Sequence, residues 1–239
     1  MLPTDQFPAV EPGTRWNTAS ARGPRTINAD AVGAFADVFA LADGVGDHES
    51  AAQAARTAAA AAVRSPVSAG PVAAVLAAQH AVLELRGTGD CVLVVAMPLP
   101  DGAGYRIAWV GDARAYSTGG GTLRQLTTDH TLAQYFRDHG QPTAPHMEHM
   151  VTTSVLTAGA HEIGTAETHA DGLLLTSDGV HKTLTAATIL DILAQPEHAA
   201  SALVETAIAL GGSDNATALV VEPVGSRADL TTTPLTTAA

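Results

Sequence analysis

Two stretches of this sequence, VFALADG at residues 38–44 and LLLTSDG at residues 173–179, decide the fold that we expect. Each is an apolar run typical of a buried β-strand, and each ends in Asp-Gly. A third apolar run, IAWVG at residues 107–111, is followed by Asp112. The sequence therefore predicts several strands that present a carboxylate at the point where they end.

Two further aspartates stand just before expected strands. Asp30 precedes one of them, and Asp214 with Asn215 precedes the apolar run at residues 216–221. Carboxylates on one sheet edge repel one another unless cations lie between them, and carboxylates with backbone carbonyls suit hard divalent ions such as Mg²⁺ or Mn²⁺. A single Asp-Gly pair is more often a turn or a helix cap. The repeated arrangement nevertheless predicts a divalent-cation site.

The remaining pattern predicts an α+β fold in a single domain. Helices are expected at residues 50–64, 72–85, 131–139, 185–194 and 198–210, and further strands at residues 91–97, 106–110, 113–117, 123–126 and 217–222. Helices cluster along the chain instead of alternating with strands, which argues against repeated βαβ units. We expect a mobile N-terminal segment at residues 1–14, one domain at residues 15–224 and a flexible tail at residues 225–239.

Composition excludes several classes of protein. The chain has 239 residues and a formal net charge of −12, which argues against a nucleic-acid binder or a protein held on anionic lipid. No apolar run reaches the roughly 18 residues of a membrane span, and the N-terminus does not resemble a signal peptide. One cysteine, Cys91, excludes an internal disulfide framework. A soluble cytoplasmic protein is therefore expected.

Seven short motifs, in order along almost the whole chain, resemble those of the PP2C (PPM) family of metal-dependent Ser/Thr protein phosphatases. They are RTINAD at 25–30, ADGVGDH at 42–48, GTG at 87–89, VGDARAY at 110–116, LTTDHT at 126–131, LLTSDG at 174–179 and DNAT at 214–217. Each motif is weak alone, but seven in order are a strong signal. The resemblance implies a four-layer α-β-β-α sandwich, in which two antiparallel sheets lie face to face and a helical pair flanks each.

The resemblance also implies roles for individual residues. Asp43 is expected to bridge two metal ions and the carbonyl of Gly44 to bind one of them, while the other expected metal ligands are Asp30, Asp178 and Asp214. Asp129 matches a position that binds a third, weaker metal in bacterial members. Arg25 matches the arginine that holds the substrate phosphate, so the expected catalytic residues are Asp43, Asp178 and Arg25.

The implied activity is hydrolysis of phosphoserine and phosphothreonine on proteins. A hydroxide shared by two Mn²⁺ or Mg²⁺ ions attacks the phosphorus in line, since the metals lower the pKa of the bound water. The implied partners are phosphorylated proteins, with a Ser/Thr kinase or its targets among the candidates, and the chain is expected to be a monomer of bacterial type. Residues 132–170 would form the flap over the site.

Some positions depart from the family pattern and motivate an alternative. Ala29 replaces the usual Glu or Gln, Asp47 replaces a glycine, and Gly89 replaces a threonine. Val45 stands where animal members place a proposed general-acid histidine. The alternative is a pseudophosphatase, which keeps the fold and binds phosphoproteins with little turnover, although the retained aspartates argue against it.

Other kinds of site have less support in the sequence. A cysteine-dependent phosphatase needs Cys-x₅-Arg, but the sixth residue after Cys91 is Met97. The GDHE element at residues 46–49 resembles binuclear metallophosphoesterases but lacks their upstream D-x-H, and Gly44-Val-Gly46 lacks the third glycine of a dinucleotide site. A zinc site at His146 and His149 lacks a clear third ligand.

Three charged residues near the motifs are predicted to have structural and not catalytic roles. We expect Asp112 and Arg114 to bond to each other or to the backbone. Lys182, which follows Asp178 by four residues, is interpreted as part of a solvated helix start.

Overall fold

The computed structural model describes residues 14–85, 87, 89–170 and 172–222. The expected terminal segments, residues 1–14 and 225–239, therefore lie outside the described residues except for Thr14, as does Thr88 of the GTG motif. Within the described ranges, no helix is both long enough and apolar enough to cross a membrane.

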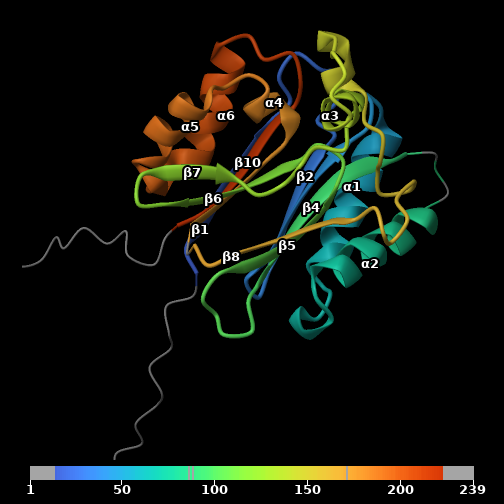
Figure 1. Ribbon diagram of the computed structural model, residues 1–239, viewed down its shortest axis with the longest axis horizontal. Coiled ribbons are helices and arrows are strands. Elements are labelled where there is room, and N and C mark those ends of the chain that lie inside the picture. The colour runs from blue at the N-terminus through green and yellow to red at the C-terminus, as the bar shows by residue number, and fades with distance from the viewer. Residues whose placement is uncertain (1–13, 86, 88, 171, 223–239) are drawn as a thin grey trace, which may run out of the picture.

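Two five-stranded antiparallel sheets form the centre of the molecule (Figure 1). In spatial order, the first sheet contains β1 (Trp16–Ala21), β10 (Ala216–Val221), β9 (Gly172–Thr176), β6 (Arg114–Gly119) and β7 (Thr122–Gln125). The second contains β2 (Asp30–Phe35), β3 (Val38–Gly44), β4 (Cys91–Pro98), β5 (Tyr105–Val110) and β8 (Gly164–Thr168).

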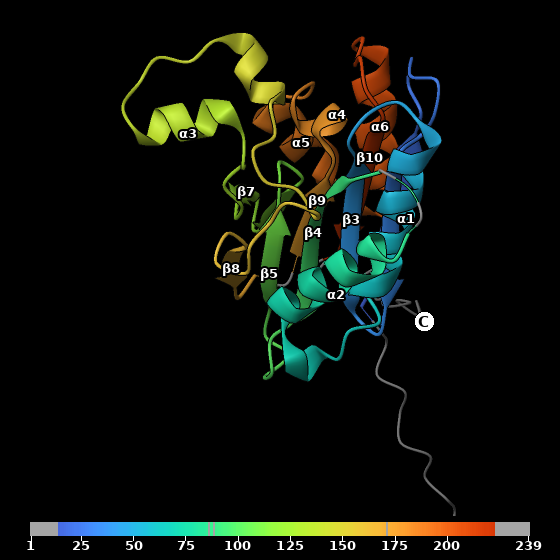
Figure 2. The same ribbon diagram turned by 90° about the vertical axis from the view of Figure 1, so that its right-hand side faces the viewer.

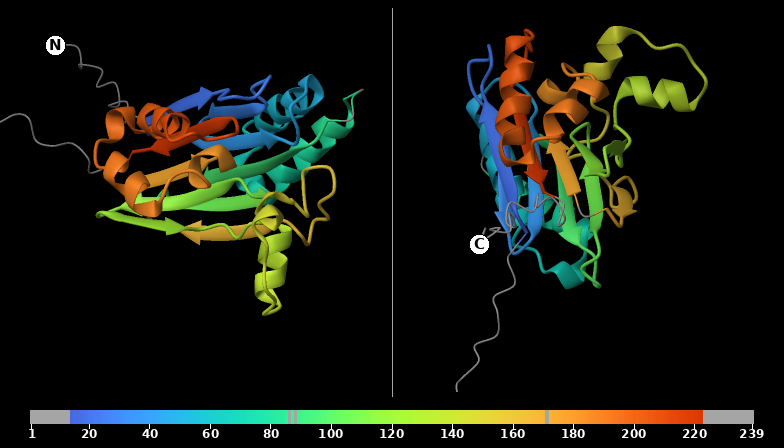
Figure 3. Two further views of the ribbon diagram at one scale, coloured as in Figure 1. Left: turned by 90° about the horizontal axis from the view of Figure 1, so that it is seen from above. Right: turned by 90° about the vertical axis from the view of Figure 1, so that its left-hand side faces the viewer.

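Helices cover both outer faces of the sheet pair. The second sheet packs against α1 (Glu49–Ala62) and α2 (Pro71–Leu83), and the first against α4 (Asp178–His181), α5 (Ala186–Leu193) and α6 (Ala199–Ala209). Seen from above, these two groups of helices lie on opposite sides of the strands (Figure 3). The expected four-layer sandwich is thus confirmed, with two long helices on each side.

Strand β3 shows how the sequence builds these layers. Its side chains alternate: Phe39 and Leu41 enter the core between the two sheets, while the smaller Val38, Ala40 and Ala42 face α1 and α2. Alanines of α1 meet this face, which permits a close approach of helix and sheet. The abundant alanine therefore fills the thin layer under the helices, and the larger residues fill the layer between the sheets.

A two-residue turn fixes the register of β2 against β3. Ala36 and Asp37 both have positive φ, at 46° and 62°, as a type I′ hairpin turn requires. This turn places Asp30 opposite Asp43 at the far end of the hairpin. The register of the hairpin therefore places two carboxylates opposite each other on adjacent strands.

One segment projects from the sandwich at the end where these aspartates lie (Figure 2). It contains α3 (Leu132–Asp138) and a short 3₁₀ helix, η2 (Pro145–His149), and Thr131 pairs with Val151 where the segment returns. Strands β1 and β8 and the short helix α4 were not among the expected elements. The strand expected after Asp30 is β2, which begins at Asp30 itself. The helices and strands that were predicted with bounds agree with the structure within two residues at each end.

Candidate functional site

A pocket of about 310 Å³ opens at the end of the two sheets. It brings together five of the residues expected to bind metal or phosphate. The lining residues are Arg25, Asp43, Gly44, Val45, Gly46, Val92, Asp112, His149, Val151, Asp178 and Asp214. Asp30 does not line the pocket but lies opposite Asp43 in the neighbouring strand. Asp129 does not line it either.

The four central aspartates come from both sheets. Asp30 and Asp43 belong to the β2–β3 hairpin of one sheet. Asp178 begins α4 two residues after the end of β9, and Asp214 lies two residues before β10, both in the other sheet's connections. The Ser177 hydroxyl donates a hydrogen bond of 2.8 Å to Asp30 Oδ2 and so joins the two halves. The site thus depends on the face-to-face packing of the two sheets.

Two glycines allow the backbone to approach closely at this site. A Cβ on Gly44 would lie 2.7 Å from the carbonyl oxygen of Ala51 and 2.9 Å from the Cβ of Ala29. A Cβ on Gly179 would lie 2.0 Å from the carbonyl oxygen of Asn215. Both Asp-Gly pairs therefore need glycine for packing, and the small Ala29 fits the same crowded contact.

The aspartates carry more negative charge than their surroundings neutralise. Burial, together with the charges of Asp30 and Asp178, raises the pKa of Asp43 well above its ordinary value. Burial also raises the pKa of Asp30, from 3.8 to about 6, against hydrogen bonds from Thr217 and Ser177 that lower it. Within the described residues, the buried oxygens Asp30 Oδ1 and Asp178 Oδ1 have no hydrogen-bond partner.

These features fit a divalent cation. Buried carboxylate oxygens without partners are costly, and a cation among them removes both the repulsion and the missing interactions. Among the described residues, no group of three or more His, Cys, Asp or Glu side chains is already arranged as a complete ligand set. The fit therefore rests on the shared charge and the open lone pairs of the aspartates.

Asp30 should make the stability of the metal-free protein depend on pH. The folded chain keeps this proton up to about pH 6, whereas the unfolded chain releases it near 3.8, so the free energy of unfolding should fall as the pH rises between these values. The side chain in Asp30→Asn is neutral at every pH, so the variant should not lose stability as the pH rises. At pH 7 its free energy of unfolding should exceed that of wild type by about 1–3 kcal/mol. Chemical denaturation with chelator present, at pH 4.5 and pH 7, measures the effect. A stability difference between wild type and variant that is the same at both pH values would contradict it.

Arg25 lies at the rim of the pocket on a loop that is held from two sides. Its Nη2 donates to Asp214 Oδ2 at 2.6 Å, and its Nε donates to the carbonyl of Ser213. The backbone N–H groups of Thr26 and Ile27 both donate to Asp47, which lowers the pKa of that exposed carboxyl group. The unusual Asp47 therefore braces the loop that carries Arg25.

Asn215 fastens the same loop to β10. Its Oδ1 accepts a hydrogen bond from the N–H of Ala29, and its Nδ2 donates to the carbonyls of Arg22 and Ile27, all at 2.8 Å. Asn215 and Ala29 are both buried. Asn215 thus positions the loop that carries Arg25 and leads into β2 at Asp30.

Lys182 is not the solvated residue that the sequence suggested. Its Nζ donates to Asp112 Oδ2 at 2.7 Å, to Asp178 Oδ2 at 2.9 Å and to the carbonyl of Glu148 at 2.9 Å. Burial works against the charged ammonium, but the charges of Asp178 and Asp112 outweigh it and raise the pKa of Lys182. The interpretation failed because Lys182 directly follows α4, four residues after Asp178, so the two side chains lie on the same side of this helical turn and form an ion pair at the site.

Arg114 pairs with Asp129 and not with Asp112. The guanidinium donates to both carboxylate oxygens, at 2.9 Å and 2.7 Å, in a two-point ion pair. The expected bond between Asp112 and Arg114 is therefore wrong, since Asp112 is bound by Lys182 instead. A third metal ion at Asp129 would have to displace or share this ion pair.

The other candidate groups have structural surroundings. Cys91 is buried, and burial raises the pKa of its thiol well above the ordinary value, which suits a core residue. His48 of the GDHE element caps α1, where its side chain accepts from the N–H of Ala51. His149 lines the pocket, whereas His146 does not.

The sequence of this chain is similar to that of a known bacterial protein phosphatase. No protein-family model matches the chain. It is 32% identical over 236 residues to the Ser/Thr protein phosphatase PstP of Mycobacterium tuberculosis, covering 88% of this chain and 45% of PstP, so the chain spans about half the length of that relative.

Two solved structures are similar over nearly their whole length. The PPM Ser-Thr phosphatase MsPP of Mycobacterium smegmatis, in complex with cacodylate, is 30% identical with a TM-score of 0.72, covering 87% of this chain and 98% of that one. The catalytic domain of PstP in complex with two manganese ions is 29% identical with a TM-score of 0.71, covering 87% and 97%.

Proposed function

We propose that this chain, which belongs to the PPM (PP2C-type) family of Ser/Thr protein phosphatases, hydrolyses phosphoserine and phosphothreonine on proteins with the help of Mn²⁺ or Mg²⁺. The observation that carries the proposal is the meeting of four aspartates beside Arg25, namely Asp30, Asp43, Asp178 and Asp214. Two of their buried carboxylate oxygens have no hydrogen-bond partner among the described residues. The PstP catalytic domain, which shares this fold, binds two manganese ions.

The aspartates and one carbonyl are the groups that would hold the ions. Asp43 would lie between two ions, the carbonyl of Gly44 would bind one of them, and Asp30, Asp178 and Asp214 would supply the other protein ligands. When bound, such ions lower the pKa of water and neutralise charge on the phosphoryl oxygens. The catalytic roles of Asp43 and Asp178 in this account are to place the ions and to keep them in the pocket.

Arg25 would bind the substrate phosphate. Its guanidinium lies at the rim, is partly exposed and now contacts Asp214. A planar guanidinium can grip two phosphate oxygens at once. The loop braces at Asp47 and Asn215 keep Arg25 at the rim while it exchanges its carboxylate partner for the phosphate.

Arg25→Ala is expected to weaken phosphate binding by about 1.5–3 kcal/mol, the value of one charged hydrogen-bonded contact. The KM for a phosphothreonine peptide should rise roughly 10- to 150-fold if the loss is in substrate binding. Arg22→Ala, on the same loop, is the matched control, because the Arg22 guanidinium donates to the carbonyl of Thr26 and does not line the pocket. Unchanged KM and kcat in Arg25→Ala would refute the role.

The substrates are proposed to be phosphorylated proteins, as the function of the relatives suggests, and a Ser/Thr kinase or its targets to be the partners. We further propose that the chain acts as a monomer in the cytoplasm. Gel filtration of the purified chain with light scattering tests the monomer directly, and a stable dimer at micromolar concentration would overturn it.

The proposed activity is tested by phosphate release from a phosphothreonine peptide and from p-nitrophenyl phosphate, with Mn²⁺ and with chelator. Turnover with Mn²⁺ and none with chelator is the expected result. Cys91→Ala should keep the turnover of wild type, because the thiol is buried in the core and does not line the pocket. Equal rates with and without metal would overturn the mechanism, and tight metal binding without turnover on either substrate would identify a pseudophosphatase.

A further inference from the structure

His149 is the one imidazole among the described residues that line the pocket. The side chain is exposed, and within the described part of the chain its ring has no hydrogen bond, ion pair or ring contact. It thus faces the proposed phosphate site with both ring nitrogens available. Imidazole is also the side chain best suited to exchange a proton near neutral pH.

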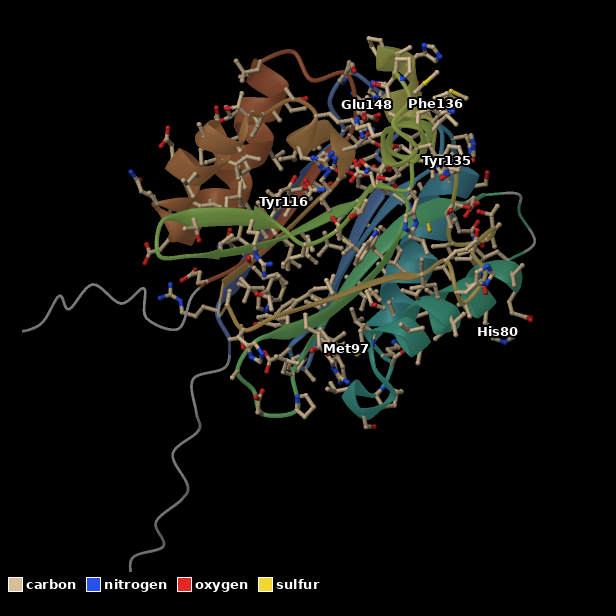
Figure 4. All side chains as sticks on the ribbon, in the orientation of Figure 1. His80, Met97, Tyr116, Tyr135, Phe136 and Glu148 are labelled. Atoms are coloured by element: carbon tan, nitrogen blue, oxygen red, sulfur yellow. The ribbon has the colours of Figure 1, made fainter. Side chains whose placement is uncertain are left out.

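The backbone on both sides of His149 is held firmly. The carbonyl of Glu148 accepts a hydrogen bond of 2.9 Å from Lys182, and the carbonyl of Met150 accepts one of 2.8 Å from the N–H of Leu132. Figure 4 shows Glu148, Tyr135 and Phe136 at one end of the molecule, which is the end where α4 lies. Met97, in β4, lies toward the other end of the molecule. An exposed side chain on a fixed backbone is already positioned for a substrate that enters the pocket.

The other groups at the pocket are poor proton donors for a leaving group. Val45, Val92 and Val151 carry no proton to give, and the guanidinium of Arg25 does not deprotonate in proteins. All three N–H bonds of the Lys182 ammonium are directed to Asp112, Asp178 and Glu148. Of the aspartates that line the pocket, Asp43, Asp178 and Asp214 are assigned to the cations. The fourth, Asp112, accepts a hydrogen bond from Lys182.

We propose that His149 is the general acid of the reaction. The proposal rests on the phosphatase function proposed above. As water attacks phosphorus, the bond between phosphorus and the serine or threonine oxygen breaks, and its electron pair stays on that oxygen. The protonated ring of His149 gives this oxygen a proton. Inorganic phosphate and a free hydroxyl group result, and the neutral imidazole regains its proton from solvent.

The test compares two leaving groups in the Mn²⁺-loaded protein. Nitrophenolate is stable without a proton, whereas a serine or threonine alkoxide is strongly basic and needs one to leave. His149→Ala should therefore lower kcat/KM for the phosphothreonine peptide by about 100-fold or more. The same variant should change kcat/KM for p-nitrophenyl phosphate by less than about threefold. Free imidazole in the buffer should restore part of the peptide activity of His149→Ala.

His146→Ala is the matched control, since His146 lies one turn earlier in η2 and does not line the pocket. It should leave both substrates within about threefold of wild type. Equal losses on the two substrates in His149→Ala, or no loss on the peptide, would overturn the role of His149 while leaving the phosphatase function intact. A wild-type protein that hydrolyses neither substrate would overturn both proposals.

Discussion

Asp43→Asn is expected to remove phosphatase activity by at least about a thousandfold while leaving the fold intact. Asp43 lies at the pocket opposite Asp30, and the charges of Asp30, Asp178, Asp112 and Asp214 all act on it. An amide of the same shape cannot bridge two cations, so the stabilisation of charge on the phosphoryl group should be lost. The measurement is kcat/KM on a phosphothreonine peptide with saturating Mn²⁺.

The same substitution should make the metal-free protein more stable, because it removes a buried negative charge from among four others. A raised melting temperature with lost activity separates a chemical defect from misfolding. Asp101→Asn is the control, since Asp101 lies on the exposed β4–β5 turn, where its carboxylate accepts from the N–H of Ala103, and does not line the pocket. An Asp43→Asn protein that retains more than a tenth of the activity would contradict the assignment.

Asn215→Ala is expected to cost about 3 kcal/mol of folding free energy. It removes three hydrogen bonds of 2.8 Å and leaves the buried N–H of Ala29 without a partner. For a domain of this size, the melting temperature should fall by about 6–12 °C. Thermal unfolding monitored by circular dichroism, with chelator present, measures the effect.

Asn28→Ala provides the comparison for this loss. Asn28 lies in the same loop and is only partly buried; its amide donates to Ser20 at the surface, and its Oδ1 accepts from the N–H of Asp30 at 3.2 Å. Its replacement should cost about 1–2 kcal/mol, less than Asn215→Ala, because it removes two partly exposed hydrogen bonds instead of three made by a buried side chain. If the two variants lose equal stability, the three hydrogen bonds of Asn215 are not what holds the loop in place.

Much of the fold could be predicted because local and tertiary preferences agree. The run at residues 38–44 alternates in the structure between large side chains in the core and small ones under α1, which matches its sequence. Strand β8 was missed because it lies at a sheet edge and has a half-exposed, polar pattern, GTAET. Strand β1 was missed for the same reason, since WNTASA is largely polar and depends on pairing with β10.

The site could be predicted only as far as residue types at strand ends allow. Asp43, Asp178 and Asp214 do meet at one pocket, and the hairpin register brings Asp30 opposite Asp43. Most partners of the charged residues could not be predicted, because they come from distant segments; Asp178, four residues before Lys182, is the exception. Arg114 pairs with Asp129 across the β6–β7 hairpin, and Lys182 reaches the carbonyl of Glu148, 34 residues away.

The central claim is that these aspartates form a site for divalent cations in which phosphate esters are hydrolysed. It is tested most directly by calorimetric titration of Mn²⁺ into the chelator-treated, dialysed protein. Saturable binding of about two ions per chain is expected, with binding weakened at least tenfold in Asp43→Asn and unchanged in Asp101→Asn. Binding that is absent in wild type, or that is equally strong in Asp43→Asn, would contradict the claim.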